Sequence, residues 1–318
     1  MAQGTAPAAV AASLPSPAAA SAVVIVLNSG DGSVSLIDRT TFKVVGSIPV
    51  GREPHHLMPT LDRERLIVAN AASNDLVMLN PRSGAVLDRI PKISDPYQIG
   101  YSPDGKWFVS VSLRLDRVDI YHAADLRLAK RIAVGKMPSH VAFDAESKFA
   151  FVTLQEANQV VAIDLQRHAV SHTVAVGNAP AGAWMTPDDR HLLVGITGED
   201  HVAVIDWRAR KVVRKIPTGK GAHNFLPKGD GRHIFLTNRV ANTISLIDMQ
   251  DLRVVRTLDV PGGPDCMELT ADGKELWVTA RFAKRVAVVD VESGKVKQTI
   301  PVGRSPHGIY FHDHAPRR

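Results

Sequence analysis

The decapeptide "IPVGREPHHL" at residues 48–57 returns in altered form every 42 residues along the chain, and this spacing decides the fold. The last copy is "IPVGRSPHGI" at residues 300–309 of 318. The copies between them are "IPKISDPYQI" from Ile90, "IAVGKMPSHV" from Ile132, "VAVGNAPAGA" from Val174, "IPTGKGAHNF" from Ile216 and "LDVPGGPDCM" from Leu258. An uninterrupted repeat of this length is typical of proteins that stack copies of one small structural unit.

Each unit consists of short runs rich in Val and Ile that are separated by turn residues. The stretches "SPDGKWFVSVS" (102–112) and "ADGKELWVTAR" (271–281) place an Asp-Gly turn between two such runs, which is the signal for a β-hairpin. Four strands per 42-residue unit and seven units predict an all-β fold, a seven-bladed β-propeller with four-stranded blades around a central channel. The aspartates of the hairpin turns are expected to be structural.

The repeat is out of phase with the ends of the chain. Residues 23–50 contain only the last three strands of a unit, and residues 305–312 contain only the first. We therefore expect the C-terminal strand to pair with the N-terminal strands, which closes the ring and leaves no sheet edge open. The expected organisation is a disordered Ala/Pro-rich lead at 1–22, a single propeller domain at 23–312 and a tail at 313–318.

Several motifs resemble a known family of repeat proteins. The segments "GREPHHL", "SPDGKWFVSVS" and "FLTNRVANTISLIDMQDLRVVRTLDV" are similar to the YVTN family of β-propeller repeats, of the YncE-like periplasmic or surface-layer type. The resemblance covers residues 23–312 and implies the propeller fold. The family includes surface-layer and periplasmic binding proteins, accessory proteins of periplasmic oxidation pathways and relatives of lactonases, so the resemblance implies no single activity.

The composition is that of a globular protein with a basic surface. Charged residues make up 22% of the chain, and the net charge is +6 with acidic and basic residues interspersed. No run approaches the roughly eighteen apolar residues of a membrane span, and one cysteine, Cys266, excludes an internal disulfide. The uncharged lead lacks the regions of an intact signal peptide and suits a mature exported chain. We expect a monomer that is periplasmic or secreted, with a cytosolic protein as the alternative.

Histidines gather at the repeat position that follows the proline of the inner strand. In blade order this first ring position holds His307, His55, Tyr97, Ser139, Ala181, His223 and Asp265. Four consecutive blades therefore supply a candidate metal ligand, namely His223, Asp265, His307 and His55. Three imidazoles and one carboxylate suit a transition metal such as Zn, Cu or Fe. A general acid/base cluster, a polar pocket without metal and a plain solvated rim are the alternatives.

The next position of the repeat adds further polar groups. This second ring position holds Gly308, His56, Gln98, His140, Gly182, Asn224 and Cys266. Strand alternation predicts that the second position faces the channel and that the first lies at the rim above it. Loops of adjacent blades add Arg239 and Arg281, which either bind an anionic ligand or pair with a neighbouring carboxylate. The expected ligand-binding residues are His55, His56, Tyr97, Gln98, His140, Asn224, Arg239 and Arg281.

Two more histidines, His312 and His314, form the motif "HDH" after the last strand. They are expected at the opposite end of the channel, either as a loose metal chelate or as part of a frayed tail.

The sequence predicts an extracytoplasmic binding or scaffold protein. Its His- and Arg-lined face would bind a small anionic ligand, a metal ion or a partner protein. No nucleophile elbow, phosphate loop or metalloprotease motif occurs, so a binding protein is favoured over an enzyme; a lactonase-like hydrolase or a redox accessory enzyme with a His-based site is the alternative. The charge alone suggests nucleic-acid binding, and an aromatic content of 5% argues against it because few rings are available for base stacking.

Overall fold

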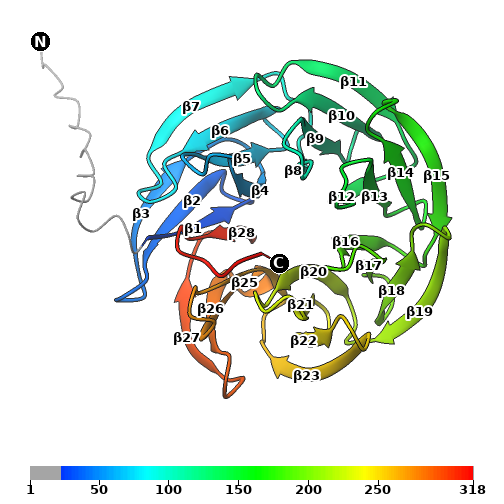
Figure 1. Cartoon of the computed structure of the whole chain (residues 1–318). Helices are drawn as coiled ribbons and strands as arrows, with labels where there is room; N and C mark the ends of the chain where they lie inside the picture. Colours follow the sequence, from blue (N-terminus) through cyan, green and yellow to red (C-terminus); the bar gives the residue numbers. More distant parts are fainter. Residues whose placement is uncertain (1–22, 318) are drawn as a thin grey trace, which may run out of the picture.

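Seven four-stranded antiparallel sheets form a ring in the computed structural model, which describes residues 23–317 (Figure 1). The all-β seven-bladed propeller is confirmed. The lead expected at residues 1–22 lies outside the described residues.

The first four blades occupy the N-terminal half of the chain and the last strand. Blade 1 contains β28 (Pro306–Tyr310), β1 (Val23–Asn28), β2 (Ser33–Asp38) and β3 (Lys43–Pro49). Blade 2 contains β4 (Pro54–Pro59), β5 (Leu66–Asn70), β6 (Asp75–Leu79) and β7 (Val86–Pro91). Blade 3 contains β8 (Gln98–Tyr101), β9 (Trp107–Ser112), β10 (Arg117–His122) and β11 (Leu128–Ala133). Blade 4 contains β12 (Pro138–Phe143), β13 (Phe149–Leu154), β14 (Gln159–Asp164) and β15 (Ala169–Ala175).

The remaining three blades repeat the same order of inner to outer strand. Blade 5 contains β16 (Pro180–Met185), β17 (His191–Ile196), β18 (His201–Asp206) and β19 (Lys211–Pro217). Blade 6 contains β20 (Ala222–Pro227), β21 (His233–Asn238), β22 (Thr243–Asp248) and β23 (Arg253–Asp259). Blade 7 contains β24 (Pro264–Leu269), β25 (Glu275–Ala280), β26 (Arg285–Asp290) and β27 (Val296–Pro301), with a short 3-10 helix, η2 (Arg281–Ala283).

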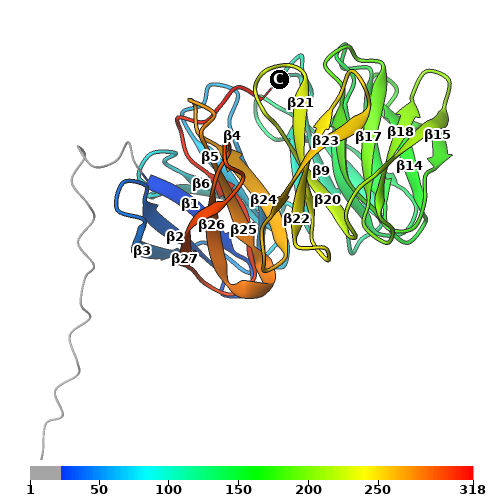
Figure 2. The same cartoon turned by 90° about the horizontal axis from the view of Figure 1, so that it is seen from below.

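The ring is closed by β28, which lies beside β1 in Figure 1. Ile25 is opposite Tyr310 and Val26 is opposite Ile309 in an antiparallel pair. Tyr310 and the following Phe311 are buried, so the last strand adds aromatic side chains to the core as well as hydrogen bonds to β1. The closure expected from the incomplete units is confirmed. The chain then continues to the far end of the channel, where the C-terminus lies near β21 (Figure 2).

The core lies between the faces of neighbouring blades. All residues of β1 are buried, whereas nearly every residue of the outer strand β7 is exposed. Between blades 1 and 2, for example, Leu27 and Leu36 pack with Leu66, and each buried leucine contributes about 1.5–3 kcal/mol. Inner and middle strands are covered on both faces by adjacent blades, which explains their nearly continuous apolar sequences. No helix within residues 23–317 has the length and apolar character needed to cross a membrane.

The outer hairpin turns have the structural role expected of their aspartates. In five blades the first carboxylate oxygen of this residue accepts the backbone N–H two residues later; these are Asp62, Asp104, Asp188, Asp230 and Asp272. The carboxylates thus stabilise the turns between the first and second strands of these blades.

The inner strands carry a β-bulge where the candidate site residues lie. In β20 the register with β21 shifts between Ala222 and Phe225, so His223 and Asn224 are both opposite Thr237. A matching shift occurs in β4, β12, β16, β24 and β28. A bulge places two residues opposite one and redirects a side chain, so both ring positions reach the centre. The second ring position lines the channel cavity, as expected, whereas the histidines and the aspartate of the first position are buried and do not form an open rim.

Candidate metal centre

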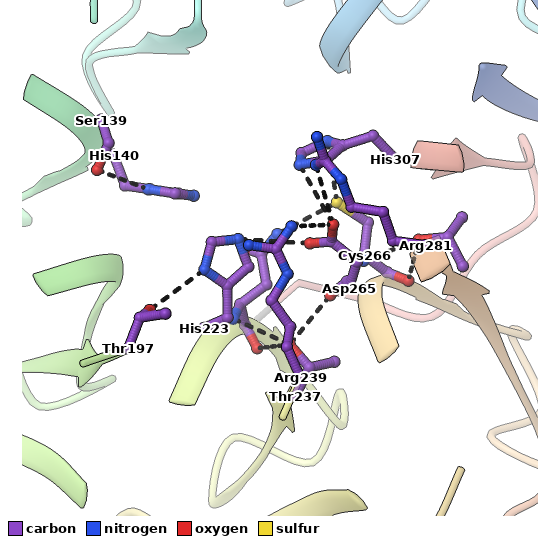
Figure 3. Close-up of polar contacts among 12 residues, drawn as sticks. Ser139, His140, Thr197, His223, Thr237, Arg239, Asp265, Cys266, Arg281 and His307 are labelled. Carbon is purple, nitrogen blue, oxygen red and sulfur yellow. Dashed lines mark hydrogen bonds and ion pairs between the residues drawn. The ribbon is translucent and has the colours of Figure 1, made fainter. Parts of the chain in front are cut away.

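The bulged inner strands bring five imidazoles together at the centre of the ring. They belong to His55, His56, His140, His223 and His307, none of which is more than 9% exposed. Figure 3 shows Asp265 and Cys266 of β24 beside His223 and His307. Two groups of three residues have ligand atoms within 4.8 Å of one another: His223, Asp265 and His307, and His55, His56 and His307.

The Asp265 carboxylate anchors the first group. It is fully buried, and its Oδ2 accepts hydrogen bonds from Arg239 Nη2 at 2.6 Å and from Arg281 Nη1 at 3.2 Å. Burial alone would raise the pKa of Asp265, but the neighbouring positive charges, that of Arg239 foremost, hold the pKa well below its usual range. The sequence left open whether the two arginines bind an anionic ligand or pair with a carboxylate. In the structure they pair with a carboxylate. Only Oδ2 takes part, and Oδ1 has no hydrogen-bond partner within the described residues.

Backbone carbonyls fix the tautomers of His307 and His56. His307 Nδ1 is 2.5 Å from the carbonyl oxygen of His55, and His56 Nδ1 is 2.7 Å from that of Tyr97. A carbonyl oxygen only accepts hydrogen bonds, so Nδ1 carries the proton in both rings. The Nε2 atom of each ring therefore has a free lone pair. A hydrogen bond from Nδ1–H to a carbonyl oxygen orients the imidazole to bind a metal through Nε2.

A threonine has the same effect on His223. Thr197 Oγ1 donates its proton to the carbonyl oxygen of Ala222 at 2.7 Å, so it can only accept from His223 Nδ1 at 3.4 Å. His223 Nε2 therefore also has a lone pair.

Three hydrogen-bond acceptors, each with a free lone pair, consequently lie close to one another. His223 Nε2 is 3.4 Å from Asp265 Oδ1, and His307 Nε2 is 3.7 Å from Asp265 Oδ2. Within the described residues, both Nε2 atoms and Oδ1 are buried without a hydrogen-bond partner, which is costly unless a cation lies between them. Ligand atoms about 2.0–2.2 Å from a tetrahedral zinc ion are roughly 3.3–3.6 Å apart. The distance between His223 Nε2 and Asp265 Oδ1 has this value, and the ligand atoms of all three residues lie within 4.8 Å of one another.

Burial keeps the imidazoles neutral. It lowers the pKa of His56 to about 4, and it lowers the pKa values of His223 and His307 well below the usual 6.5. The pKa of the Cys266 thiol is raised well above 9.0, again mainly by burial. Near pH 7 a protonated histidine therefore does not supply the positive charge that the three buried acceptors require. Cys266 remains a thiol at this pH.

His55 occupies a different place from the other predicted metal ligands. Its ring lies between those of Tyr97 and His307, with centroid distances of 3.9 and 3.8 Å. Its Nδ1 is 2.9 Å from His56 Nδ1. The predicted set of four is thus divided: His223, Asp265 and His307 share one group, and His55 joins His56 in the second.

Among the other predicted ligand-binding residues, Tyr97 packs against His55, and the rest border a cavity in the channel. A cavity of about 230 Å³ is bordered there by His56, Gln98, His140, Asn224 and Cys266, with apolar residues further along. Asn224 Nδ2 donates to Cys266 Sγ at 3.2 Å, and Gln98 Oε1 accepts the N–H of Val141 at 2.5 Å. Of the five imidazoles, those of His56 and His140 border this cavity.

Two threonines that support the centre were not predicted. Thr197 sets the tautomer of His223, and Thr237 Oγ1 accepts the N–H of Asn224 at 3.0 Å while contacting the carbonyl oxygen of Asp265 at 3.1 Å. Thr237 belongs to the "FLTN" segment of the repeat, so the motif itself was the available signal. Thr153 and Thr279 accept the same bulge N–H in their own blades.

Fold and site together define a seven-bladed β-propeller with a buried His/Asp/Arg centre. The profile of the YNCE-like β-propeller family matches residues 2–317, and the chain belongs to this family. The earlier resemblance to YncE-like repeats is thereby confirmed.

Solved structures share the fold at low sequence identity. Hydrazine synthase of Kuenenia stuttgartiensis is 19% identical, with a TM-score of 0.69 over 80% of this chain and 88% of that chain. Dihydro-heme d1 dehydrogenase NirN in complex with DHE is 17% identical, with a TM-score of 0.68 over 92% and 76%. A protein of unknown function from Desulfotomaculum acetoxidans is 16% identical, with a TM-score of 0.77 over 93% and 99%. The search of curated proteins gave no match.

Proposed function

We propose that this protein is an extracytoplasmic binding protein that holds a transition-metal ion at the centre of the propeller. His223 Nε2, Asp265 Oδ1 and His307 Nε2 are the proposed ligands. One observation carries the proposal: these three buried hydrogen-bond acceptors lie close together, and no donor of the described residues satisfies them. Imidazole nitrogen with one carboxylate oxygen suits Zn, Cu or Fe, as the sequence suggested.

The net positive charge of the centre favours an anion that binds together with the metal ion. With neutral imidazoles, Asp265 and the two arginines give a net charge of +1, and a divalent ion raises it to +3 (−1 + 2 + 2). A buried site of that charge is unfavourable without an anionic co-ligand. The cavity beside His56 and His140 offers space for one. The small anionic ligand and the metal ion predicted from the sequence are therefore proposed to bind together.

Equilibrium dialysis of the purified protein against Zn²⁺, Cu²⁺ or Fe²⁺, followed by elemental analysis, tests the proposal. One ion per chain is expected. His223→Ala and His307→Ala should each weaken binding at least about 100-fold, because loss of a ligand costs at least as much as loss of an outer-shell partner. His191→Ala, which changes a histidine at the outer hairpin, is the matched control and should bind normally.

Circular dichroism and thermal melting of each variant separate loss of a ligand from loss of the fold. The proposal is wrong if the folded protein takes up no metal. It is equally wrong if folded His223→Ala and His307→Ala bind as tightly as the His191→Ala control.

The co-ligand is tested with Arg281→Gln. Removing one positive charge should leave metal binding unchanged or tighter, because the guanidinium repels the cation. Binding of acetate or azide to the metal-loaded protein should become roughly tenfold weaker. Unchanged anion binding in this variant would show that the arginines do not attract a co-ligand.

A further inference from the structure

A second group of cationic residues lies at the other end of the channel, where the chain ends. A hollow of about 500 Å³ is lined there by Arg63 and Glu64 of the β4–β5 turn, Arg82 of the β6–β7 turn, and His312, Asp313 and His314 of the C-terminal segment. None of these residues takes part in the metal centre. The sequence motif "HDH" thus has a defined place in the fold.

The C-terminal segment that carries the two histidines is fixed to the ring. Asp313 forms a bidentate ion pair with Arg39 at 2.8 and 2.6 Å. The N–H of Ala315 donates to the carbonyl oxygen of Leu269 at 2.8 Å. Arg317 Nη2 then binds Glu268 Oε2 at 2.6 Å, and this glutamate is buried. Three contacts to blades 1 and 7 therefore hold His312 and His314 in position.

Each histidine accepts a hydrogen bond from a different arginine. Arg82 Nη2 is 2.9 Å from His312 Nε2, and Arg63 Nη2 is 3.1 Å from His314 Nε2. The two imidazoles orient the guanidinium groups and do not form a chelate, because their Nε2 atoms are already engaged. A guanidinium carries five N–H donors, so most donors of both arginines remain available to a ligand.

Neither arginine of this hollow forms an ion pair with a carboxylate of the described residues. Within residues 23–317, neither Arg63 nor Arg82 has a carboxylate within 4.0 Å, since Asp313 is engaged by Arg39. Glu64 and Asp313 also border the hollow, so they reduce its positive charge without pairing with Arg63 or Arg82. Two oriented guanidiniums around one hollow are suited to bidentate binding of an oxyanion.

We propose that this hollow, named here the tail site, binds a small dianion with phosphate chemistry, either inorganic phosphate or a phosphate monoester. Arg63 and Arg82 donate to the phosphate oxygens from two blade turns, and His312 and His314 keep the two guanidiniums pointed at it. A concave site of about 500 Å³ fits a small molecule. The tail site binds without metal and independently of the central site.

Isothermal titration of the metal-free protein with inorganic phosphate and with glycerol phosphate tests the proposal at constant ionic strength. Arg63→Gln and Arg82→Gln should each weaken binding roughly tenfold or more, because a hydrogen bond between charged groups is lost. Arg65→Gln removes the same charge from the same hairpin without bordering the hollow, and it should bind as the unchanged protein does. Stronger binding of the ester identifies a phosphorylated metabolite, and equal binding identifies phosphate itself.

Three results would overturn the proposal. The first is the absence of phosphate binding at millimolar concentrations. The second is equal weakening by Arg65→Gln, which would indicate general charge attraction, as would tight binding of a DNA oligonucleotide that phosphate does not displace. The third is binding that is unchanged in Arg63→Gln and Arg82→Gln but lost in Arg281→Gln, because the anion would then occupy the central site.

Discussion

At the scale of single residues, Asp265 connects the arginine pair with the histidines of the proposed metal site. Its Oδ2 accepts hydrogen bonds from Arg239 and Arg281, and its Oδ1 faces His223. The sequence indicated these residues through their repeat positions, because equivalent positions of adjacent blades must lie close together around the channel. It could not indicate that both arginines share one carboxylate oxygen, since that depends on side-chain conformation.

Asp265→Asn removes this charge with little change of shape. The two guanidiniums then lose their partner in a buried site, so the free energy of unfolding should fall by about 3–5 kcal/mol. Metal affinity should fall at least about 100-fold, because an amide oxygen is a poorer ligand than a carboxylate. Urea unfolding and metal titration measure the two effects. A variant of unchanged stability would show that the Asp265 ion pairs contribute nothing, and unchanged metal affinity would exclude Asp265 as a ligand.

The neutral imidazoles predict how stability depends on pH. The folded protein holds the pKa of His56 at about 4, against about 6.5 in the unfolded chain, and burial lowers the pKa of His140 and His223 in the same direction. Below pH 6.5 the unfolded chain therefore binds protons that the folded protein excludes, so stability falls with falling pH. His56 alone accounts for about 3 kcal/mol between pH 6.5 and 4. Urea midpoints of the metal-free protein should decrease across this window, and a constant midpoint would contradict neutral buried histidines.

At the scale of elements, the β-bulge of the inner strand determines which side chains reach the centre. Alternation along a regular strand predicted that only one of the two ring positions would face inward. The register shift at β20 and β24 brings His223 and Asn224, and likewise Asp265 and Cys266, to the same place. The apolar pattern of "HNFLP" and "DCMEL" contains no sign of this shift. The threonine opposite the bulge was the accessible clue.

Thr237→Val tests the role of that threonine in β21. The hydroxyl contacts the Asn224 N–H and the Asp265 carbonyl, and valine has nearly the same shape without hydrogen bonding. We expect a loss of about 1–3 kcal/mol in stability and weaker metal binding, because the bulge that positions His223 is no longer fixed. The control is Thr257→Val in the outer strand β23, which should change neither quantity. If both variants behave alike, the bulge does not depend on Thr237.

At the scale of the whole molecule, the fold was predictable because the repeat runs without insertion from residue 23 to 312. Its phase relative to the chain ends also predicted that β28 closes the ring. The contacts of Asp313, Ala315 and Arg317 could not be predicted, because they lie outside the repeat and depend on which blades meet the end of the chain.

Two truncated chains test the closure. A chain that ends at Val302 lacks β28 and should not unfold cooperatively, because β1 loses its partner and the core loses Ile309, Tyr310 and Phe311. A chain that ends at Phe311 retains the strand, so it should remain folded and bind metal but lose phosphate binding. Circular dichroism melting curves compare them. A cooperative transition in the shorter chain would contradict closure by β28.

The central claim is that a transition metal binds among His223, Asp265 and His307. Anomalous diffraction from crystals grown with Zn²⁺ and recorded at the zinc absorption edge tests it most directly. The account predicts one strong peak about 2.0–2.2 Å from His223 Nε2, Asp265 Oδ1 and His307 Nε2. Crystals of the zinc-saturated protein that show no peak between these three atoms would contradict it.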